Sequence, residues 1–306
     1  MRKIVSTIIA VSLAGIQMFG QNESFQAMRF DMEPSSAALA GSAIASGKSV
    51  AYAALKNASV LPFIDKTSDI AVSYSMWAPQ SGKSDGINIG CGVKAGNRFG
   101  YSLAVSRKSG TTYDVIDDMG NSKGTFETSS MVLAGGIGLK ITDALGLGIN
   151  AKYLSETLSP DSKPSSFGAD LFAIYHTNNL NVTAGLSSVG ASVKDVAGNA
   201  FKLPMSVTAG VSYSADAGEN SAFEVDGAMD YFFSGNFTAA AGAQYIWNKL
   251  IAIRAGYHYD SEAAAVPSYA SIGAGLSIRG IHFDIAYLTA NPIIGGSINI
   301  GVGYRF

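Results

Sequence analysis

Three histidines and one cysteine are the side chains best able to bind a metal or to move a proton. They are His176, His258, His282 and Cys91. A metal or acid–base site would need the histidines to converge with a carboxylate such as Asp170 or Asp284. The predicted strands that carry them are not all neighbours, and we expect His176 and His258 near extracellular strand ends. We therefore expect solvated histidines, no metal and no cofactor. The single cysteine also excludes an internal disulfide framework.

No segment carries the signature of an enzyme or of a nucleic-acid-binding protein. No serine stands in the sharp strand-to-helix setting of a hydrolase nucleophile, and the glycines within residues 135–138 lie inside a predicted strand rather than in a phosphate loop. The formal net charge is −2, and no cluster of Lys and Arg creates a basic surface. We therefore expect no enzymatic activity and no nucleic acid partner.

Charged side chains form a second group, on the polar face of segments in which apolar and polar residues alternate. The group consists of Lys94, Lys152, Asp170, Glu224, Asp226, Asp230, Arg254, Asp284 and Arg305. A Lys or Arg that faces lipid at mid-bilayer would cost roughly 2–4 kcal/mol, so a consistent place on the polar face supports this assignment of faces. We expect Arg254 and Arg305 to pair with carboxylates in a lumen and to help hold an N-terminal segment there. Pairing among these charges without further function is the alternative.

The composition favours many strands with small side chains. Of the 306 residues, 14% are charged and 35 are glycine, whereas about 25% of residues in soluble proteins are charged. Residues 1–20 place Arg2 and Lys3 before a short apolar run, with a possible cleavage point after Gly20, as in a signal peptide. No later segment has the ~20 apolar residues of a spanning helix. A membrane-spanning form of this chain would therefore be a barrel.

From residue 69 onward, apolar and polar residues alternate in segments of about 10 residues, the length that tilted strands need to cross a bilayer. Fourteen strands are predicted: 69–78, 85–95, 98–107, 127–140, 144–155, 166–177, 180–188, 205–215, 221–231, 236–246, 249–259, 268–278, 280–289 and 296–306. An even number of strands is usual for a single-chain bacterial barrel. We expect an all-β fold, a 14-stranded antiparallel transmembrane β-barrel.

The connections between these strands alternate in length. After even-numbered strands they are mostly tight, as at 96–97 and 142–143, and after odd-numbered strands they are longer, as at 108–126 and 189–204. Outer-membrane barrels have short periplasmic turns and long extracellular loops, whereas a soluble sandwich has no reason to sort its loops in this way. We therefore expect a place in the bacterial outer membrane, with lipid around the barrel.

The last ten residues alternate without interruption between apolar and polar positions. The pattern allows a soluble sheet or a barrel, and the sorted loops favour a closing strand paired with the first strand near residues 69–78. Tyr304 and Phe306 then face outward in the periplasmic aromatic girdle. An outward aromatic residue in this place resembles the assembly signal of outer-membrane barrels, so we expect both residues to support membrane insertion.

Residues 21–68 differ from the rest of the chain because they are rich in alanine and have no period of two. Pro34 could begin a short helix, and Gly41 and Gly47 could end one. We interpret the segment as a compact, partly helical hatch inside the barrel, with a mobile periplasmic tail as the alternative. The predicted organisation is a signal peptide at 1–20, a hatch at 21–68 and a barrel at 69–306.

Two long loops, 108–126 and 189–203, are polar with scattered aromatic residues. Tyr113, Phe126 and Phe201 are therefore candidates for contact with a partner. Plain solvated loops are an equally good interpretation.

The sequence RFDMEPSSAALAGSAIA of residues 29–45 resembles the start of PorV/PorQ family proteins, which lie within the wider FadL-like superfamily. That family continues with an Asn-Pro-Ala element, and here only Asn57 and a small residue match it, because the proline is absent. The resemblance implies a 14-stranded outer-membrane barrel with a hatch, found in Bacteroidota, and singles out Arg29 and Asn57 as hatch residues. It also implies that the barrel docks or shuttles secreted and surface proteins in a type IX secretion system, without chemistry of its own.

Two functions remain open after the resemblance. A docking barrel would bind surface or secreted proteins through its extracellular loops, whereas a FadL-like barrel would passively transport hydrophobic small molecules. A lipid-binding lumen should be lined by large apolar side chains, and only Phe172, Ile174 and a few others are predicted to face inward. This favours docking. A secreted soluble β-protein is a third possibility, against which the sorted loops and the uncovered final strand argue.

Overall fold

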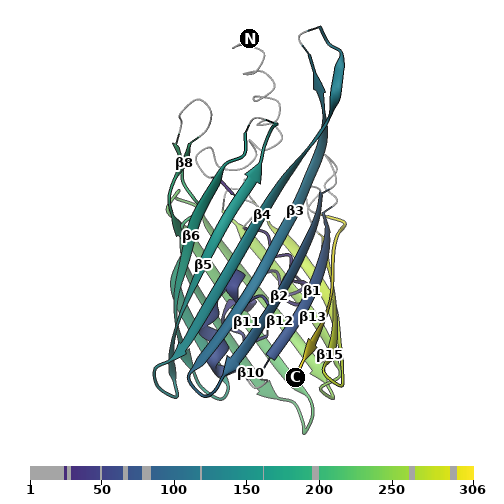
Figure 1. Ribbon diagram of the computed structural model, residues 1–306. Coiled ribbons are helices and arrows are strands. Elements are labelled where there is room, and N and C mark those ends of the chain that lie inside the picture. The colour runs from purple at the N-terminus through teal and green to yellow at the C-terminus, as the bar shows by residue number, and fades with distance from the viewer. Residues whose placement is uncertain are drawn as a thin grey trace.

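The computed structural model describes residues 24–25, 29–48, 50–64, 68–77, 84–117, 119–160, 162–194, 200–261, 266–289 and 295–306. Fourteen strands form a closed antiparallel barrel in which β7 pairs with β10 and β16 pairs with β1 (Figure 1). The barrel strands are β1 (Ser68–Trp77), β2 (Ser84–Ala95), β3 (Phe99–Ile116), β4 (Ser122–Lys140), β5 (Leu145–Thr157), β6 (Ser165–His176), β7 (Leu180–Gly190), β10 (Ser206–Asp216), β11 (Ala222–Phe232), β12 (Phe237–Trp247), β13 (Ile251–Asp260), β14 (Tyr269–Ile278), β15 (Ile281–Thr289) and β16 (Ser297–Arg305). The predicted fold class is confirmed.

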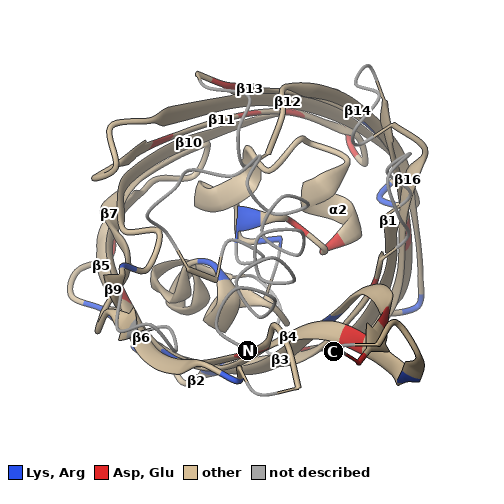
Figure 2. Cartoon of the chain, turned by 90° about the horizontal axis from the view of Figure 1, so that it is seen from above, with Lys and Arg blue, Asp and Glu red and all other residues tan. Residues whose placement is uncertain are grey.

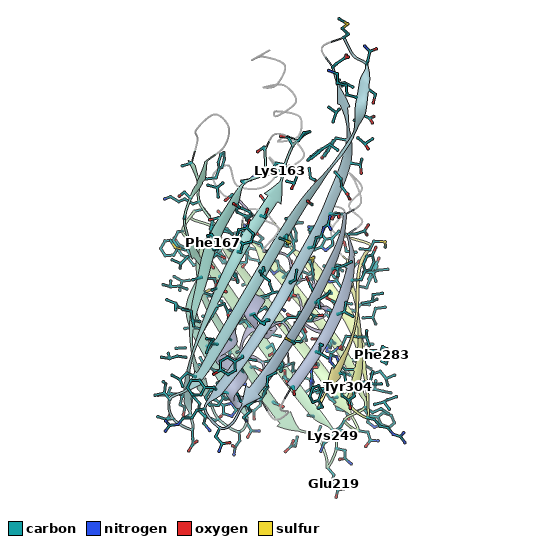
Figure 3. The ribbon with its side chains drawn as sticks, in the orientation of Figure 1. Lys163, Phe167, Glu219, Lys249, Phe283 and Tyr304 are labelled. Atoms are coloured by element: carbon teal, nitrogen blue, oxygen red, sulfur yellow. The ribbon has the colours of Figure 1, made fainter. Side chains whose placement is uncertain are left out.

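Alternation of side chains explains why the sheet closes around a polar interior. On β1, Ile70 and Tyr74 are exposed on the outside, whereas Ser73 and Ser75 are buried on the inside. Because every strand has two paired neighbours, the wall has no open edge, which is the condition for β-structure in lipid. Figure 3 shows side chains such as Phe167, Phe283 and Tyr304 standing out from the wall. The outer surface therefore has the apolar band of a membrane-spanning barrel.

The two ends of the barrel differ. One end carries short turns, such as those after β2 and β4, and is called the turn end; the opposite end is called the loop end. In outer-membrane barrels the turn end faces the periplasm. Tyr304 and Phe306 both face outward at the turn end, with ring centroids 5.5 Å apart. Their role in insertion remains a prediction. No helix within the described residues is long and apolar enough to span a membrane.

The predicted loop at 108–126 is wrong in one respect, because β3 and β4 continue through most of it as a paired hairpin. This hairpin projects beyond the other strands at the loop end (Figure 1). At its tip the carboxylate of Asp117 accepts hydrogen bonds from the backbone N–H groups of Met119 and Asn121, each at 2.9 Å. The bond from Asn121 in particular lowers the pKa of the Asp117 carboxyl. The other long loop contains the two-residue strands β8 (Val193–Lys194) and β9 (Ala200–Phe201).

The N-terminal segment lies inside the barrel as the predicted hatch (Figure 2). It contains α2 (Pro34–Ala37) and three 3-10 helices, η2 (Ala43–Ala45), η3 (Ala53–Leu55) and η4 (Ala58–Phe63). Pro34 opens α2, where its missing N–H costs nothing. Asn57 caps η4 by accepting the backbone N–H of Ser59 at 3.0 Å. The described part of the segment therefore packs against the inside of the wall, and its role as a hatch remains a prediction. The predicted signal peptide lies outside the described residues.

The hatch has two lobes that pack on different parts of the wall. The first lobe, residues 29–48, places α2 against β14, β15 and β16 and η2 against β7, β10 and β11. The second lobe, residues 50–64, places η3 and η4 against β2, β3, β4, β5 and β6. Both approach the wall closely. A Cβ on Gly256 would overlap the carbonyl group of Leu39, and a Cβ on Gly138 would overlap the carbonyl oxygen of Ala58.

Candidate functional site: the lumen and its hatch

An ion-pair network fills the lumen near the turn end. Arg254 Nη1 lies 2.6 Å from Asp284 Oδ1, and Arg305 Nη2 lies 2.8 Å from Asp69 Oδ2. His282 joins the two pairs, with Nε2 3.0 Å from Asp69 and Nδ1 3.2 Å from Asp284. All these groups are partly or fully buried. Each arginine pairs with a carboxylate, and this pairing offsets the cost of removing its charge from water.

This network extends to the hatch through Lys48. Lys48 Nζ lies 2.5 Å from Glu224 Oε2, and the backbone oxygen of Lys48 accepts a 3.2 Å hydrogen bond from Arg305. Gln244 bridges the remaining gap, because its Nε2 donates to Glu224 at 3.0 Å and its Oε1 accepts from Arg254 Nε at 3.2 Å. Arg305 therefore contacts the hatch directly, whereas among the described contacts Arg254 reaches it through Gln244 and Glu224. Their part in retaining the hatch remains a prediction.

The other predicted lumen charges lie higher in the barrel or beside this network. Asp226 is buried next to Glu224 on β11. Asp230 accepts hydrogen bonds from the hydroxyl groups of Thr208 and, at 3.4 Å, Thr238.

Both hatch residues singled out by the resemblance contact the wall. Arg29 pairs with Asp260 at 3.3 Å and lies over the ring of Phe232, 3.9 Å from its centroid. Asn57 Nδ2 donates to Thr183 Oγ1 and to the carbonyl oxygen of Ile44, both at 3.1 Å.

A second ion cluster, absent from the sequence prediction, lies within the hatch itself. Lys56 Nζ lies 2.8 Å from Asp31 Oδ2 and 2.8 Å from Glu33 Oε2. The acids belong to the first lobe and the lysine to the second, so this cluster joins the two lobes. The sequence could not predict this contact, because the partners lie more than twenty residues apart in a segment of irregular structure.

An upper cavity of about 240 Å³ occupies the loop-end half of the lumen, between the hatch and the wall. Its apolar lining includes Phe25, Phe30, Phe232, Val266 and Tyr269. The strands themselves place few large apolar side chains inward, and the hatch adds Phe25 and Phe30 to this lining. Phe172 and Ile174 do face inward, but most of the aromatic surface comes from strand ends and from the hatch. Tyr269 occupies a position that the alternation of β14 places on the inner face, so the sequence alone predicts that its side chain faces the lumen.

Lys108 places a cation in this aromatic surrounding. Its Nζ lies 4.0 Å from the ring centroid of Phe30 and 4.4 Å from that of Trp77, and these two rings meet edge to face at 4.2 Å. Within the described residues, no carboxylate forms an ion pair with it. A buried ammonium on two aromatic faces gains cation–π energy, and it also offers a donor to any polar end of a molecule in the cavity.

A lower cavity of about 60 Å³ lies toward the turn end. Its wall includes Asp69, Arg254, His282, Asp284 and Arg305, which are the groups of the ion-pair network. Glu33 and Tyr52 line both the upper and the lower cavity. These two hatch residues therefore lie between the two cavities.

The histidines do not form a common site. His176 packs on Phe63 at the turn end, so its predicted place near an extracellular strand end is wrong, because β6 runs from the loop end to the turn end. His258 stacks on Tyr269 beside the upper cavity, and His282 lies in the ion-pair network. Across the ranges that the structure describes, no three His, Cys, Asp or Glu residues gather as metal ligands would.

The loop residues predicted to contact a partner are only partly brought together. Tyr113 and Phe126 are direct partners across the projecting β3–β4 hairpin. Phe201 lies in β9, in the other loop.

Comparison with known proteins identifies the fold. The toluene transporter TbuX of Ralstonia pickettii superposes with a TM-score of 0.64 at 12% identity, covering 89% of this chain and 98% of that one. The P. putida toluene transporter TodX gives 0.60 at 13% identity, covering 88% and 97%. A Pseudomonas aeruginosa FadL homologue gives 0.53 at 12% identity, covering 90% and 98%. No family model and no curated protein matches the sequence. The chain thus has the fold of the FadL-like 14-stranded barrels of the bacterial outer membrane.

Proposed function

We propose that this barrel is a passive channel for hydrophobic small molecules. The observation that carries the proposal is the upper cavity, in which aromatic side chains of the wall and of the hatch enclose about 240 Å³. Ligand sites combine apolar surface with polar groups that orient the ligand, and this cavity places its aromatic side chains beside charged groups that include Arg29, Lys108, Lys152 and Glu156. The neighbours in fold are toluene transporters and a FadL homologue, and their names support the same function.

The size of the cavity restricts the solute. An apolar cavity of about 150 Å³ holds benzene, so about 240 Å³ suits a molecule with one ring or a short chain. The aromatic lining replaces water around such a molecule, at roughly 25 cal/mol for each Å² of apolar surface removed from water. The preference for docking that the sequence suggested is therefore reversed.

The test measures binding and uptake with the purified full chain. Trp77 lies against Phe30 beside the cavity, so its fluorescence, recorded in a Trp247→Phe background, should change when toluene or a similar solute binds. Val266→Phe should fill the cavity and weaken both binding and uptake into proteoliposomes. Val207→Phe, at an exposed outer position, is the matched control. Equal binding by both variants would contradict the proposal.

Docking of secreted or surface proteins remains a second candidate, because the β3–β4 hairpin projects beyond the barrel and carries paired aromatic residues at Tyr113 and Phe126. Affinity purification from outer membranes, with the full chain and with a variant lacking residues 110–126, separates the two functions. Proteins that copurify with the full chain alone would support docking. Recovery of the barrel with only a bound apolar molecule would support transport.

A further inference from the structure

The boundary between the two lobes of the hatch is polar, whereas each lobe is embedded in the wall. Close approach at Gly256 holds the first lobe, and close approach at Gly138 holds the second. Between the lobes, the described side-chain contacts are the Lys56 cluster with Asp31 and Glu33 and the Asn57 hydrogen bond to Ile44. A few charged contacts are easier to exchange for water than close backbone packing. Among the described residues, the boundary between the lobes is therefore held by polar contacts, and each lobe is held on the wall by close packing.

The two cavities meet at this same boundary. Glu33, from the first lobe, and Tyr52, from the second, are the residues that line both the upper and the lower cavity. Lys56 binds Glu33 and also lines the upper cavity. Figure 2 shows charged segments of the hatch near the middle of the lumen, between its helical parts. Movement of Glu33 and Tyr52 apart would join the upper cavity on the loop side to the lower cavity on the turn side.

We propose that solutes cross this barrel between the two lobes of the hatch, and that Lys56, by binding Asp31 and Glu33, keeps this path closed. The inference rests on the proposed channel function and names the path and its controlling residue. With Lys56 in place, one ammonium holds two carboxylates of the opposite lobe. Without it, the ionic link between the lobes is lost and two acids of the first lobe face the boundary with no counter-charge from the second lobe. Water that enters to solvate these carboxylates separates the lobes, while the glycine contacts still hold each lobe on its wall.

The first experiment measures conductance in planar bilayers and swelling of proteoliposomes in arabinose. Lys56→Met should raise both by about tenfold or more, since a change of ~1.4 kcal/mol already shifts a closed–open equilibrium tenfold. Lys163→Met, an exposed position at the loop end, should leave both unchanged. Asp31→Asn with Glu33→Gln, added to Lys56→Met, removes the two uncompensated charges from the boundary and should return the conductance toward that of the unmodified chain. An unchanged conductance of Lys56→Met would overturn the proposal.

A second variant tests the path if Lys56→Met releases the whole hatch, which protease sensitivity of the lumen segment would reveal. In a Cys91→Ser background, Asp31→Cys and Lys56→Cys remove the ion pair and allow a short bis-methanethiosulfonate reagent to join the lobes, since it forms a reducible disulfide with each thiol and releases methanesulfinate. Conductance should fall on cross-linking and recover on reduction. A conductance that does not change on cross-linking would overturn the proposal.

The outcomes also separate this inference from the channel function on which it rests. Uptake of toluene by the unmodified chain together with an unchanged Lys56→Met conductance would place the path elsewhere. Failure of the unmodified chain to bind any apolar solute, with a cross-link-sensitive conductance in the cysteine variant, would overturn the solute class and retain the path.

Discussion

Lys108 shows how a single residue could set the selectivity of the lumen. A buried ammonium is ordinarily paired with a carboxylate, because an unpaired charge costs several kcal/mol to desolvate. Here two aromatic faces, Phe30 and Trp77, contact the ammonium, and the carboxylate of Glu156 acts on it from beyond ion-pair distance. Cation–π contacts contribute about 2 kcal/mol when desolvated, so part of the capacity of the ammonium to bind an anion remains available.

We therefore expect Lys108→Met to change selectivity rather than overall binding. An apolar carboxylate such as phenylpropionate should lose affinity by roughly tenfold or more, because hydrogen bonds to charged groups contribute about 1.5–3 kcal/mol. Its methyl ester should bind almost as before. Fluorescence titration of Trp77 measures both affinities. A parallel loss for acid and ester would show that Lys108 acts only through packing.

Arg254 tests whether the turn-end network retains the hatch. Arg254→Ala leaves Asp284 without its arginine and Gln244 without its donor. Removing one partner of a buried pair costs about 3–5 kcal/mol, and the disturbance reaches Lys48 through Glu224. We expect faster proteolysis of residues 29–64 in detergent, with an intact barrel on unheated gels. Arg98→Ala, at a turn outside the network, is the control. Equal protection of the hatch in both variants would count against this role.

Glycines on the inner face of β4 show how an element positions the hatch. Gly138 and Gly135 lie on the same strand, yet a Cβ on Gly138 would overlap Ala58 of the hatch, whereas a Cβ on Gly135 would make an ordinary contact with Leu103 on the outside. Alternation on β4 thus provides a test and its control within one element.

Gly138→Ala should displace the second lobe. Overpacking of this kind typically costs about 1–3 kcal/mol, and the free energy should be lost from the hatch rather than from the barrel, whose strand pairing is unaffected. Differential calorimetry and limited proteolysis measure the two parts separately. Gly135→Ala should leave both unchanged. A lower melting temperature of the barrel, together with a hatch that stays protected from protease, would contradict this account.

Elements were predictable from the sequence where alternation was strong. On β15, Ile281, Phe283 and Ile285 alternate with His282 and Asp284, and the strand begins and ends close to its predicted bounds. The β3–β4 hairpin was predicted as a loop because Gly110, Gly124 and several threonines obscure the period of two there. The contacts of the hatch were beyond sequence reasoning, since Asp31 and Lys56 meet only through the three-dimensional path of an irregular segment.

The aromatic lining was missed for a different reason. Individual strands place few large side chains inward, but Phe25 and Phe30 come from the hatch and Phe232 from a strand end that had been assigned to a loop. A cavity built from several elements does not appear in the pattern of any one of them. The proposed solute class therefore rests on the arrangement of the whole molecule and not on the pattern of any one strand.

At the scale of the whole molecule, the barrel is defined by an apolar band around a polar interior, and the position of that band can be measured. Leu103 is 63% exposed within the part of β3 that pairs on both sides, whereas Ile116 is 51% exposed on the projecting hairpin of the same strand. If lipid surrounds the barrel but not the hairpin, the two positions should respond differently to one substitution.

Leu103→Lys should destabilise the protein folded in vesicles by roughly 2–4 kcal/mol, and Ile116→Lys by roughly 0–1 kcal/mol. Denaturant titrations in the same lipid give both values. Equal losses of stability would mean either that the apolar band extends over the hairpin or that the outer face of β3 does not contact lipid. Titrations in thinner bilayers would distinguish these two cases. Only a substitution near the edge of the band changes its cost in stability when the bilayer thickness changes.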